Sequence, residues 1–473
     1  MDELVKLTAC EAVARLERRE LSPLELVEAA AARIAEVEPA VNALPTLCLE
    51  RARARARRLM EAPRPEPRPG YLFGLPIAVK DLNDVAGVRT TYGSPLYADH
   101  LPERSDLVVE RLEENGAVVI AKSNTPEFGA GANTFNEVFG ATRNPWDTRL
   151  TCGGSSGGSA VALATGEAWL ATGSDLGGSL RIPASFCSVL GLRPSPGRVA
   201  SGPAALPFAT LSVQGPMARN VADLALMLDA QCGWHASDPR SLARPEIPFA
   251  SAAREGPAPR RVAYSPDLGV APVEPEVKEI CARAAAAFAD LGARVDEACP
   301  DFGGVGEIFE ILRAAQFTAD KAPLLERHRE ALKPEIVWNI ERGLELSADQ
   351  IGRAERARGV LYHRLVAFFA DYDLLLSPAV VAPPFEVEVR YLTEVAGVSF
   401  ETYVDWLVLT FAITLTACPA LSLPCGFTAA GLPVGLQMVA PPRGEAVLLA
   451  AAARMEEHLA LHALVPMDPN GPG

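Results

Sequence analysis

Two serine- and glycine-rich clusters are the parts of this sequence best suited to do chemistry. The first is TCGGSSGGSA at Thr151–Ala160, and the second is GSDLGGSLRIP at Gly173–Pro183. A lysine, Lys80, lies upstream in the apolar segment GLPIAVKDL. A serine hydroxyl becomes a nucleophile when a neighbouring base takes its proton, and a lysine is such a base if burial lowers its pKa. Together these residue types are compatible with covalent catalysis by serine.

The first cluster, TCGGSSGGSA, has three other interpretations. A flexible linker does not fit the apolar segment AVALATGEAWLATG, which begins inside the cluster. A phosphate-binding loop would end in lysine followed by serine or threonine, and no lysine occurs from Ser123 to Val277. A nucleophile elbow, G-x-S-x-G, would centre on Ser155 or Ser156 and would need a later histidine as base. The later histidines lack suggestive polar neighbours in a loop; they are His235, His328, His363, His458 and His462.

Lys80 is the second unusual feature, because an ammonium ion is costly to bury in an apolar strand. One interpretation is that Lys80 lies at the end of its strand and reaches solvent. The other is that burial lowers its pKa until a neutral amine is available as a base. The residues alone leave both open.

The composition argues against a nucleic-acid partner. The chain has 473 residues, 49% of them hydrophobic, and a formal net charge of -15. Such a chain can bury a large core, but it lacks the clustered positive charge that nucleic-acid binding needs. The one basic run, at Glu50–Ala62, alternates arginine with alanine and is interpreted as a solvated helix face.

The cysteines and the apolar segments indicate a cytoplasmic protein. The nine cysteines are odd in number and contain no CxxC pair, which favours a reducing compartment over a disulfide framework or a zinc site. The N-terminus has no signal-peptide core, and no run of about 18 apolar residues occurs. We therefore expect no membrane partner, no metal and no cofactor.

Helical and strand-like patterns alternate along the chain and must position Lys80 and the serines. Ser22 and Pro23 predict the cap and first residue of a helix. Ser105 is predicted to cap a second helix that ends at Gly116, before a buried strand at Ala117–Lys122. This alternation predicts an α/β fold with a large mixed, mainly parallel central sheet covered by helices on both faces. The least ordered composition, Trp234–Arg261, is interpreted as a surface excursion, since the pattern resumes on both sides.

Lys80 and the two clusters together resemble the amidase signature family. Further segments look like blocks of that family: FGLPIAVKDLNDVAGVRTTYGS, NGAVVIAKSNTPEFG, NPWDTRLTCGGSSGGSAVALATG, SVQGPMARNVADLALMLDA and PALSLPCGFTAAGLPVGLQMVAP. The resemblance extends from about Leu4 to His462. It implies the amidase signature fold in a single domain over residues 1–473. Its parts are a helical N-terminal part to about residue 65, a catalytic core at about 66–230, and the rest of the sheet with the substrate pocket at about 231–473.

The resemblance also implies a Ser–Ser–Lys triad. Carried over by motif, Ser179 is the nucleophile, Ser155 is the bridging serine and Lys80 is the general base. Lys80 would take a proton from Ser155 while Ser155 takes one from Ser179, and water would then release the acyl group from Ser179. Such a mechanism needs no histidine.

Backbone N–H groups of the loop before the nucleophile are implied to bind the oxyanion. These are the amides of Leu176, Gly177 and Gly178, with that of Ser179 itself. The two glycines would let the substrate oxygen approach without a Cβ atom in the way. Gly129 matches a segment that lines the acyl pocket in relatives.

Three further features of the site follow from the resemblance. It implies a cis peptide bond between Gly154 and Ser155. Asp175 and Arg181 flank the loop and are expected to hold it as a charge-assisted pair, with direct substrate contact by Arg181 as the alternative. Ser174 stands where many relatives have threonine, and it keeps the hydroxyl.

The expected reaction is hydrolysis of a C–N amide bond in a small molecule, and aryl esters and carbamates (urethanes) share the attacked carbonyl.

A rival within the family is the glutaminase-like subunit of a tRNA-dependent amidotransferase. Its substrate-binding aspartate aligns with Leu407, and Asp405 is two residues away. The apolar stretch Tyr403–Phe411 suits a hydrophobic substrate group or the core equally well. A non-catalytic binding protein would be expected to lack a member of the triad. A homodimer is compatible with the sequence, which does not determine the natural substrate or the oligomeric state.

Overall fold

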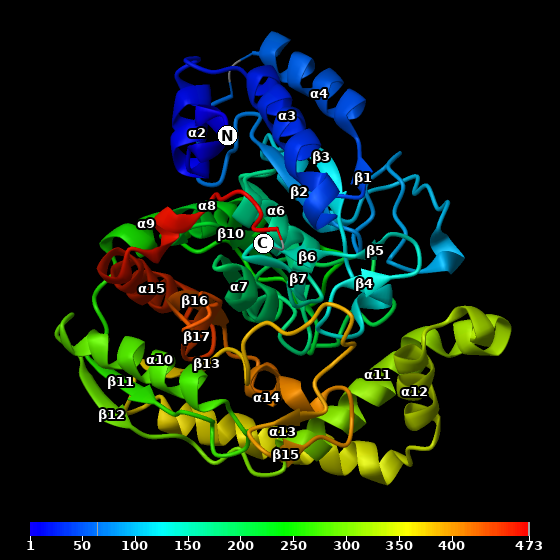
Figure 1. Cartoon of the computed structure of the whole chain (residues 1–473), viewed down its shortest axis with the longest axis vertical. Coiled ribbons are helices and arrows are strands. Elements are labelled where there is room, and N and C mark those ends of the chain that lie inside the picture. The colour runs from blue at the N-terminus through cyan, green and yellow to red at the C-terminus, as the bar shows by residue number, and fades with distance from the viewer. Residues whose placement is uncertain (64, 472–473) are drawn as a thin grey trace.

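An 11-stranded sheet runs through the protein, whose computed structural model describes residues 1–63 and 65–471 (Figure 1). Its strands come from segments between residues 46 and 439, so the sheet is assembled from most of the chain. In spatial order they are β1 (Thr46–Leu47), β3 (Val118–Ser123), β2 (Pro76–Lys80), β8 (Leu170–Asp175), β10 (Val213–Ala218), β9 (Leu190–Arg193), β16 (Ala420–Phe427), β17 (Pro433–Val439), β13 (Leu374–Pro378), β11 (Arg261–Tyr264) and β12 (Arg294–Glu297).

The sheet is mixed, as expected, but the prediction that it is mainly parallel is wrong. Strand β2 is parallel to β3 and β8, and β11 is parallel to β12 and β13. The other neighbours are antiparallel, including the whole central run from β8 through β10, β9, β16 and β17 to β13. The reason lies in the connections: β9 returns to β10, and β16 to β17, without a crossover helix, and strands joined in this way pair antiparallel.

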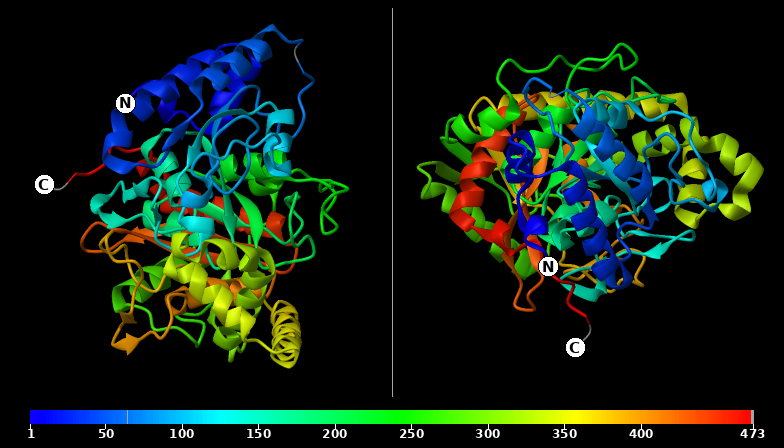
Figure 2. Two further views of the ribbon diagram at one scale, coloured as in Figure 1. Left: turned by 90° about the vertical axis from the view of Figure 1, so that its right-hand side faces the viewer. Right: turned by 90° about the horizontal axis from the view of Figure 1, so that it is seen from above.

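Helices cover the sheet in two layers. Helices α6 and α7 pack together on one side, while α8, α9 and α15 form another layer; α6 and α8 both contact β8 and β10. The blue N-terminal helices α2–α4 lie at one end of the molecule and the yellow helices α11–α13 at the other (Figures 1 and 2). The helices are α1 (Glu3–Lys6), α2 (Ala9–Glu17), α3 (Pro23–Val41), α4 (Leu49–Glu61), α5 (Leu107–Glu114), α6 (Gly157–Thr165), α7 (Arg181–Cys187), α8 (Val221–Gln231), α9 (Phe249–Glu255), α10 (Pro275–Ala286), α11 (Val305–His328), α12 (Pro334–Leu344), α13 (Ala348–Phe368), α14 (Val408–Leu415) and α15 (Glu445–Leu459).

Most local predictions of elements are confirmed. Helix α3 begins at Pro23, and its cap Ser22 forms a reciprocal capping box with Glu25. The buried strand after Gly116 is β3. The prediction that Ser105 caps the next helix is wrong: Asp106 precedes α5, and the Ser105 hydroxyl instead accepts the Ala86 N–H.

Two segments of unusual composition are part of the packed structure. Within Trp234–Arg261, helix α9 packs between α8 and α15, and strands on either side of this segment belong to the same sheet. The basic run Glu50–Ala62 forms most of α4, where Ala52 and Ala56 are buried. Three of its arginines, Arg51, Arg53 and Arg55, pair with nearby glutamates, as in the 2.9 Å contact between Arg51 and Glu113. These pairs neutralise positive charge that a nucleic acid would otherwise meet.

All nine cysteines carry free thiols. Within residues 1–63 and 65–471, no helix combines the length and hydropathy needed to cross a bilayer. In the same part of the chain, no three His, Cys, Asp or Glu side chains gather in a way that could hold a metal ion.

A buried ion pair joins the ends of β2 and β3. The Lys122 ammonium group lies 2.9 Å from the Asp81 carboxylate and 2.7 Å from the Thr90 hydroxyl, and all three residues are buried. Asp81 also accepts a 2.6 Å hydrogen bond from the Thr91 hydroxyl. Because Asp81 directly follows Lys80, this pair fixes the chain at the point where Lys80 leaves the sheet.

We expect Lys122→Met to lower the free energy of unfolding by about 3–5 kcal/mol, because it leaves the Asp81 carboxylate buried without its partner. Urea denaturation followed by circular dichroism measures the change. Lys6→Met is the matched control, since it breaks an exposed pair with Glu3 and should have little effect. A Lys122→Met protein as stable as Lys6→Met would contradict the role given to this pair.

Candidate active site

Lys80 is the last residue of β2 and is fully buried, so it does not reach solvent. Its side-chain nitrogen lies 2.8 Å from the Oγ atoms of both Ser155 and Ser156 and 3.1 Å from that of Ser174. These serines come from the glycine-rich turn before α6 and from the penultimate position of β8. Among the described residues, the hydrogen-bond partners of this nitrogen are therefore three hydroxyl groups and no carboxylate.

Burial lowers the pKa of Lys80 to about 7, against a smaller opposing effect of Asp175. A neutral amine has two N–H donors and one lone pair, which matches three hydroxyl partners. The Ser156 hydroxyl can donate to the Ser174 carbonyl oxygen, at 3.4 Å, and can accept from the lysine. The lone pair of Lys80 is then available to accept a proton from Ser155.

The glycine-rich turn is rigidly enclosed and is not a linker. Every residue from Thr151 to Ala160 is buried, and the Gly154–Ser155 peptide bond is cis, as the sequence resemblance implied. A Cβ atom on Gly158 would lie 2.3 Å from the Asn124 backbone nitrogen. These glycines allow the start of α6 to pack directly against the neighbouring backbone.

Ser179 lies at the end of the second cluster, in the loop between β8 and α7, and is partly exposed. Its carbonyl oxygen accepts the Ser156 N–H at 3.1 Å, which joins the two clusters. No direct hydrogen bond connects the Ser179 and Ser155 hydroxyls among the described residues, although both side chains border the same cavity.

The loop Asp175–Ser179 presents backbone N–H groups next to Ser179. Within the described part of the chain, the amides of Leu176, Gly177 and Ser179 have no acceptor, whereas that of Gly178 donates to Asp175 at 3.0 Å. The Thr410 hydroxyl donates to the Gly177 carbonyl oxygen at 2.6 Å and so fixes the orientation of that part of the loop.

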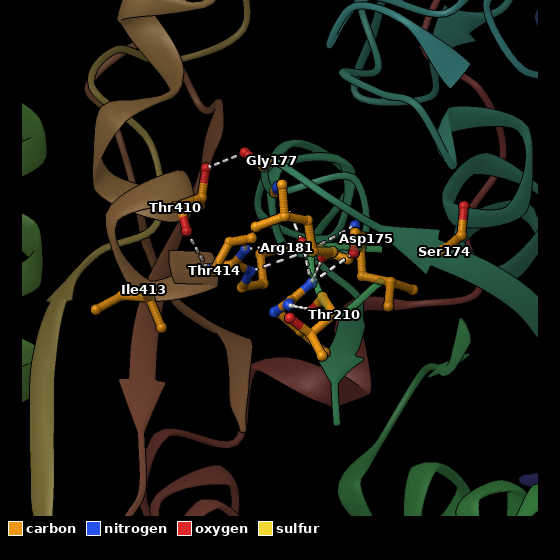
Figure 3. Close-up of polar contacts among 12 residues, drawn as sticks. Ser174, Asp175, Gly177, Arg181, Thr210, Thr410, Ile413 and Thr414 are labelled. Carbon is orange, nitrogen blue, oxygen red and sulfur yellow. Dashed lines mark hydrogen bonds and ion pairs between the residues drawn. The ribbon is translucent and has the colours of Figure 1, made fainter. Parts of the chain in front are cut away.

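A network of buried charged side chains holds the loop Asp175–Ser179 in place (Figure 3). Asp175 pairs with Arg181 at 2.8 Å and with Arg193 at 3.3 Å. Its carboxylate also accepts the N–H groups of Gly178 and Leu180. Burial alone would raise the pKa of Asp175, but the two arginines outweigh it and hold the pKa well below its ordinary value.

Arg181 has a structural role and does not face a substrate. Its side chain is fully buried, and besides Asp175 it donates to the Thr410 carbonyl oxygen, the Thr414 hydroxyl and Gln437. Figure 3 shows it between the loop and helix α14. The prediction of a charge-assisted pair with Asp175 is confirmed.

A cavity of about 80 Å³ is bordered by most of the predicted site residues, but not by Lys80 or Gly178. Gly129 borders it, and a Cβ atom there would lie 3.4 Å from the Ser155 hydroxyl. A second cavity of about 530 Å³ adjoins the first, since five residues border both. The shared residues are Leu82, Phe128, Leu176, Ser212 and Phe317. Among the described residues, no histidine borders either cavity, so a histidine-based elbow has no support.

The apolar stretch Tyr403–Phe411 divides between cavity and core. Leu407 borders the small cavity, whereas Phe411 stacks on Phe309 with ring centroids 4.2 Å apart. Asp405 accepts the N–H groups of Glu401 and Thr402 and so stabilises the turn that precedes it. It is therefore not available in the cavity.

Sequence reasoning missed the roles of four residues at the site. Ser156 and Ser174 both bind Lys80, Thr410 fixes the loop Asp175–Ser179, and Arg313 borders the cavity. The role of Ser156 could have been predicted from the sequence, because this residue directly follows Ser155. Thr410 and Arg313 lie more than a hundred residues away on α14 and α11, and only tertiary packing brings them here.

Comparison with known proteins gives consistent matches over nearly the whole chain. A protein-family model described as "Amidase" matches residues 25–449. An acylamidase of Rhodococcus erythropolis is 36% identical over 453 residues, which are 95% of each chain. A glutamyl-tRNA(Gln) amidotransferase subunit from Moorella thermoacetica is also 36% identical, over 97% of this chain and 98% of that protein.

Two solved structures share the fold. A bacterial aryl acylamidase belonging to the amidase signature enzymes superposes with a TM-score of 0.89 at 26% identity, covering 99% of this chain and all of that one. A 6-aminohexanoate cyclic dimer hydrolase in complex with substrate gives a TM-score of 0.88 at 27% identity, covering 98% and 99% of the two chains.

We expect Asp175→Asn to lower the free energy of unfolding by about 3–5 kcal/mol, since it leaves Arg181 and Arg193 buried without a counter-charge. The measurement is again urea denaturation. Asp147→Asn, which weakens an exposed pair with Arg149, serves as control and should change stability little. Equal stability of the two variants would show that the buried network does not hold the loop.

Proposed function

This chain belongs to the amidase signature family of amidohydrolases, and we propose that it hydrolyses the C–N bond of small amides through an acyl-enzyme on Ser179. The observation that carries the proposal is the 2.8 Å hydrogen bond between the buried Lys80 nitrogen and the Ser155 hydroxyl, beside the cavity that Ser179 also borders. We further propose that one catalytic domain, with its core at about 66–230, performs the reaction.

In the acylation step the Ser179 oxygen attacks the amide carbonyl carbon. The Ser179 proton passes to Ser155 as the Ser155 proton passes to the neutral Lys80 amine. When the tetrahedral intermediate collapses, the C–N bond breaks and the proton returns from Lys80 through Ser155 to the departing nitrogen. Lys80 is neutral again, and the acyl group is bound to Ser179 as an ester.

The loop before Ser179 stabilises the oxyanion of that intermediate. The amides of Leu176, Gly177 and Ser179 are the available donors, since Gly178 donates to Asp175 in this structure. Gly178 contributes the backbone conformation of the loop. Only glycine fits there, because φ is +121° and an added Cβ atom would lie 2.3 Å from the Thr410 hydroxyl oxygen. Each oxyanion donor contributes about 2.7–4 kcal/mol to transition-state stabilisation.

Deacylation uses the same groups with water as the nucleophile. Lys80 removes the water proton through Ser155, hydroxide attacks the ester carbonyl, and the proton returns to the Ser179 oxygen as the acid leaves. Esters and carbamates pass through the same tetrahedral oxyanion, so we propose aryl amides first, with aryl esters and aryl carbamates as further substrates. The similarity to acylamidases and the aromatic side chains of the larger cavity, Tyr92, Tyr97 and Phe128, support this choice.

Two other functions have less support. A glutaminase subunit of a tRNA-dependent amidotransferase is suggested by the 36% identity to that protein of Moorella thermoacetica. The cavity has the apolar Leu407 where an aspartate would bind the glutamine head group, and Asp405 is engaged with backbone amides. A non-catalytic binding protein would not need a buried lysine whose pKa is close to neutral.

A fluorophosphonate should modify Ser179 alone, because that hydroxyl is the nucleophile. Peptide mass spectrometry locates the adduct, and Ser179→Ala should lose both the adduct and hydrolysis of an aryl acetamide by at least about 10³-fold. Ser195→Ala, a buried serine outside both cavities, is the matched control. An adduct on Ser155 or Ser156, with hydrolysis retained in Ser179→Ala, would refute the assignment.

The dependence of kcat/KM on pH should report Lys80. Only the neutral amine is a base, so activity should be constant above about pH 7 and fall roughly tenfold per pH unit below it. Rates for an anilide without ionising groups, from about pH 5 to about pH 9, measure this profile. A profile that is flat across that range, or that falls as pH rises through 7, would contradict Lys80 as the base.

A further inference from the structure

Arg313 is a buried cation at the small cavity for which the proposed mechanism has no use. It lies in α11, its residue surface is 5% exposed, and it borders the cavity together with Ser155 and Ser179. Gly131 and Leu407 border the same space, so Arg313 is part of the wall that a bound substrate would meet.

Only part of the Arg313 guanidinium is engaged by the protein. Its Nε donates to the Asn339 amide oxygen at 3.0 Å, and one Nη donates to the Tyr403 hydroxyl. The group also lies over aromatic rings, with the nearest centroid, that of Phe317, at 4.7 Å. A guanidinium carries five N–H donors in a planar fork, so the other Nη and one hydrogen of the engaged Nη remain. That end of the fork matches the two oxygens of a carboxylate.

The surrounding carboxylates do not neutralise Arg313. Across the described residues, none forms an ion pair with it. Glu335 is bound by Arg390 at 2.7 Å, and Glu127 accepts the Ser94 hydroxyl and the Lys333 N–H.

Lys333 adds a second, partly buried cation nearby. It donates to the Ala130 carbonyl oxygen, and its nitrogen would lie 3.6 Å from a Cβ atom on Gly131. Lys333 borders a different cavity, so Arg313 is the cation at the site itself. A buried charge without a counter-ion is costly, so an anion that enters the small cavity would stabilise Arg313.

We propose that Arg313 binds a carboxylate on the acyl part of the substrate, so that the preferred substrates are amides of short dicarboxylic acids. The inference rests on the function proposed above, because it places the acyl part in the cavity of Ser179. The acyl group must stay beside Ser179 until water arrives, whereas the amine must leave first. The cavity of about 80 Å³ suits the short acyl chain, and the adjoining cavity of about 530 Å³ suits the departing amine.

The test compares three anilides: succinanilate (a carboxylate on the acyl chain), butyranilide (its neutral counterpart) and 4-acetamidobenzoate (a carboxylate on the amine side). The wild-type protein should hydrolyse succinanilate with a kcat/KM about 10- to 100-fold above that of butyranilide, as expected for charge-assisted hydrogen bonds to a carboxylate. Arg313→Met should bring this ratio close to one, and Arg313→Lys should retain part of it. Arg342→Met removes a charge of α12 that lies outside both cavities and should leave the ratio unchanged.

Several results would overturn the inference. A wild-type ratio near one with good turnover of butyranilide would refute it while leaving the proposed function standing. Equal losses for both substrates in Arg313→Met would assign that residue a structural role only. A preference for 4-acetamidobenzoate over succinanilate would show that the protein binds a carboxylate on the amine part of the substrate and not on the acyl part. Absence of hydrolysis of all three anilides would refute the proposed function together with the inference. The wild-type comparison holds even if Arg313→Met fails to fold.

Discussion

The burial of one amine, that of Lys80, is the constraint on which the rest of the site depends. In water this group would be an ammonium ion, but at the end of β2 it has only three serine hydroxyls around it and its pKa falls to about 7. Burial alone would be destabilising, and the hydroxyl partners offset it because they satisfy the two donors and the lone pair of a neutral amine. Ser155, Ser156 and Ser174 therefore have to lie where their hydroxyl groups can form hydrogen bonds with the buried amine of Lys80.

In the loop Asp175–Ser179, by contrast, buried groups remain charged, because each charge has a partner of opposite sign. Asp175 stays ionised between Arg181 and Arg193, and its carboxylate organises the backbone from Gly178 to Leu180. Helix α14 contributes from the far side through Thr410 and Thr414, as Figure 3 shows. A rigid loop keeps its amides oriented before a substrate arrives, which is what electrostatic stabilisation of a transition state requires.

Local sequence patterns predicted individual elements well and their arrangement only in part. Capping chemistry is local, so Ser22 identified the start of α3, whereas a choice between the adjacent Ser105 and Asp106 depended on contacts with Ala86 and the loop around Asp84. Strand direction was predicted poorly for the centre of the sheet. An alternating pattern of helix and strand implies parallel neighbours, but it does not reveal that β10 inserts between β8 and β9.

The sequence by itself singled out the two serine- and glycine-rich clusters and Lys80, and the resemblance to the amidase signature family predicted the roles of Lys80, Ser155 and Ser179. It also predicted the family through the combination of those motifs, and the comparisons with known proteins confirm that family. Only the tertiary structure decided the environment of these groups: that Lys80 is fully buried, that Thr410 supports the loop Asp175–Ser179, and that Arg313 borders the cavity with N–H donors that have no protein acceptor among the described residues. The physical reason is that pKa, hydrogen-bond satisfaction and charge compensation depend on neighbours distant in the chain, which no local pattern specifies.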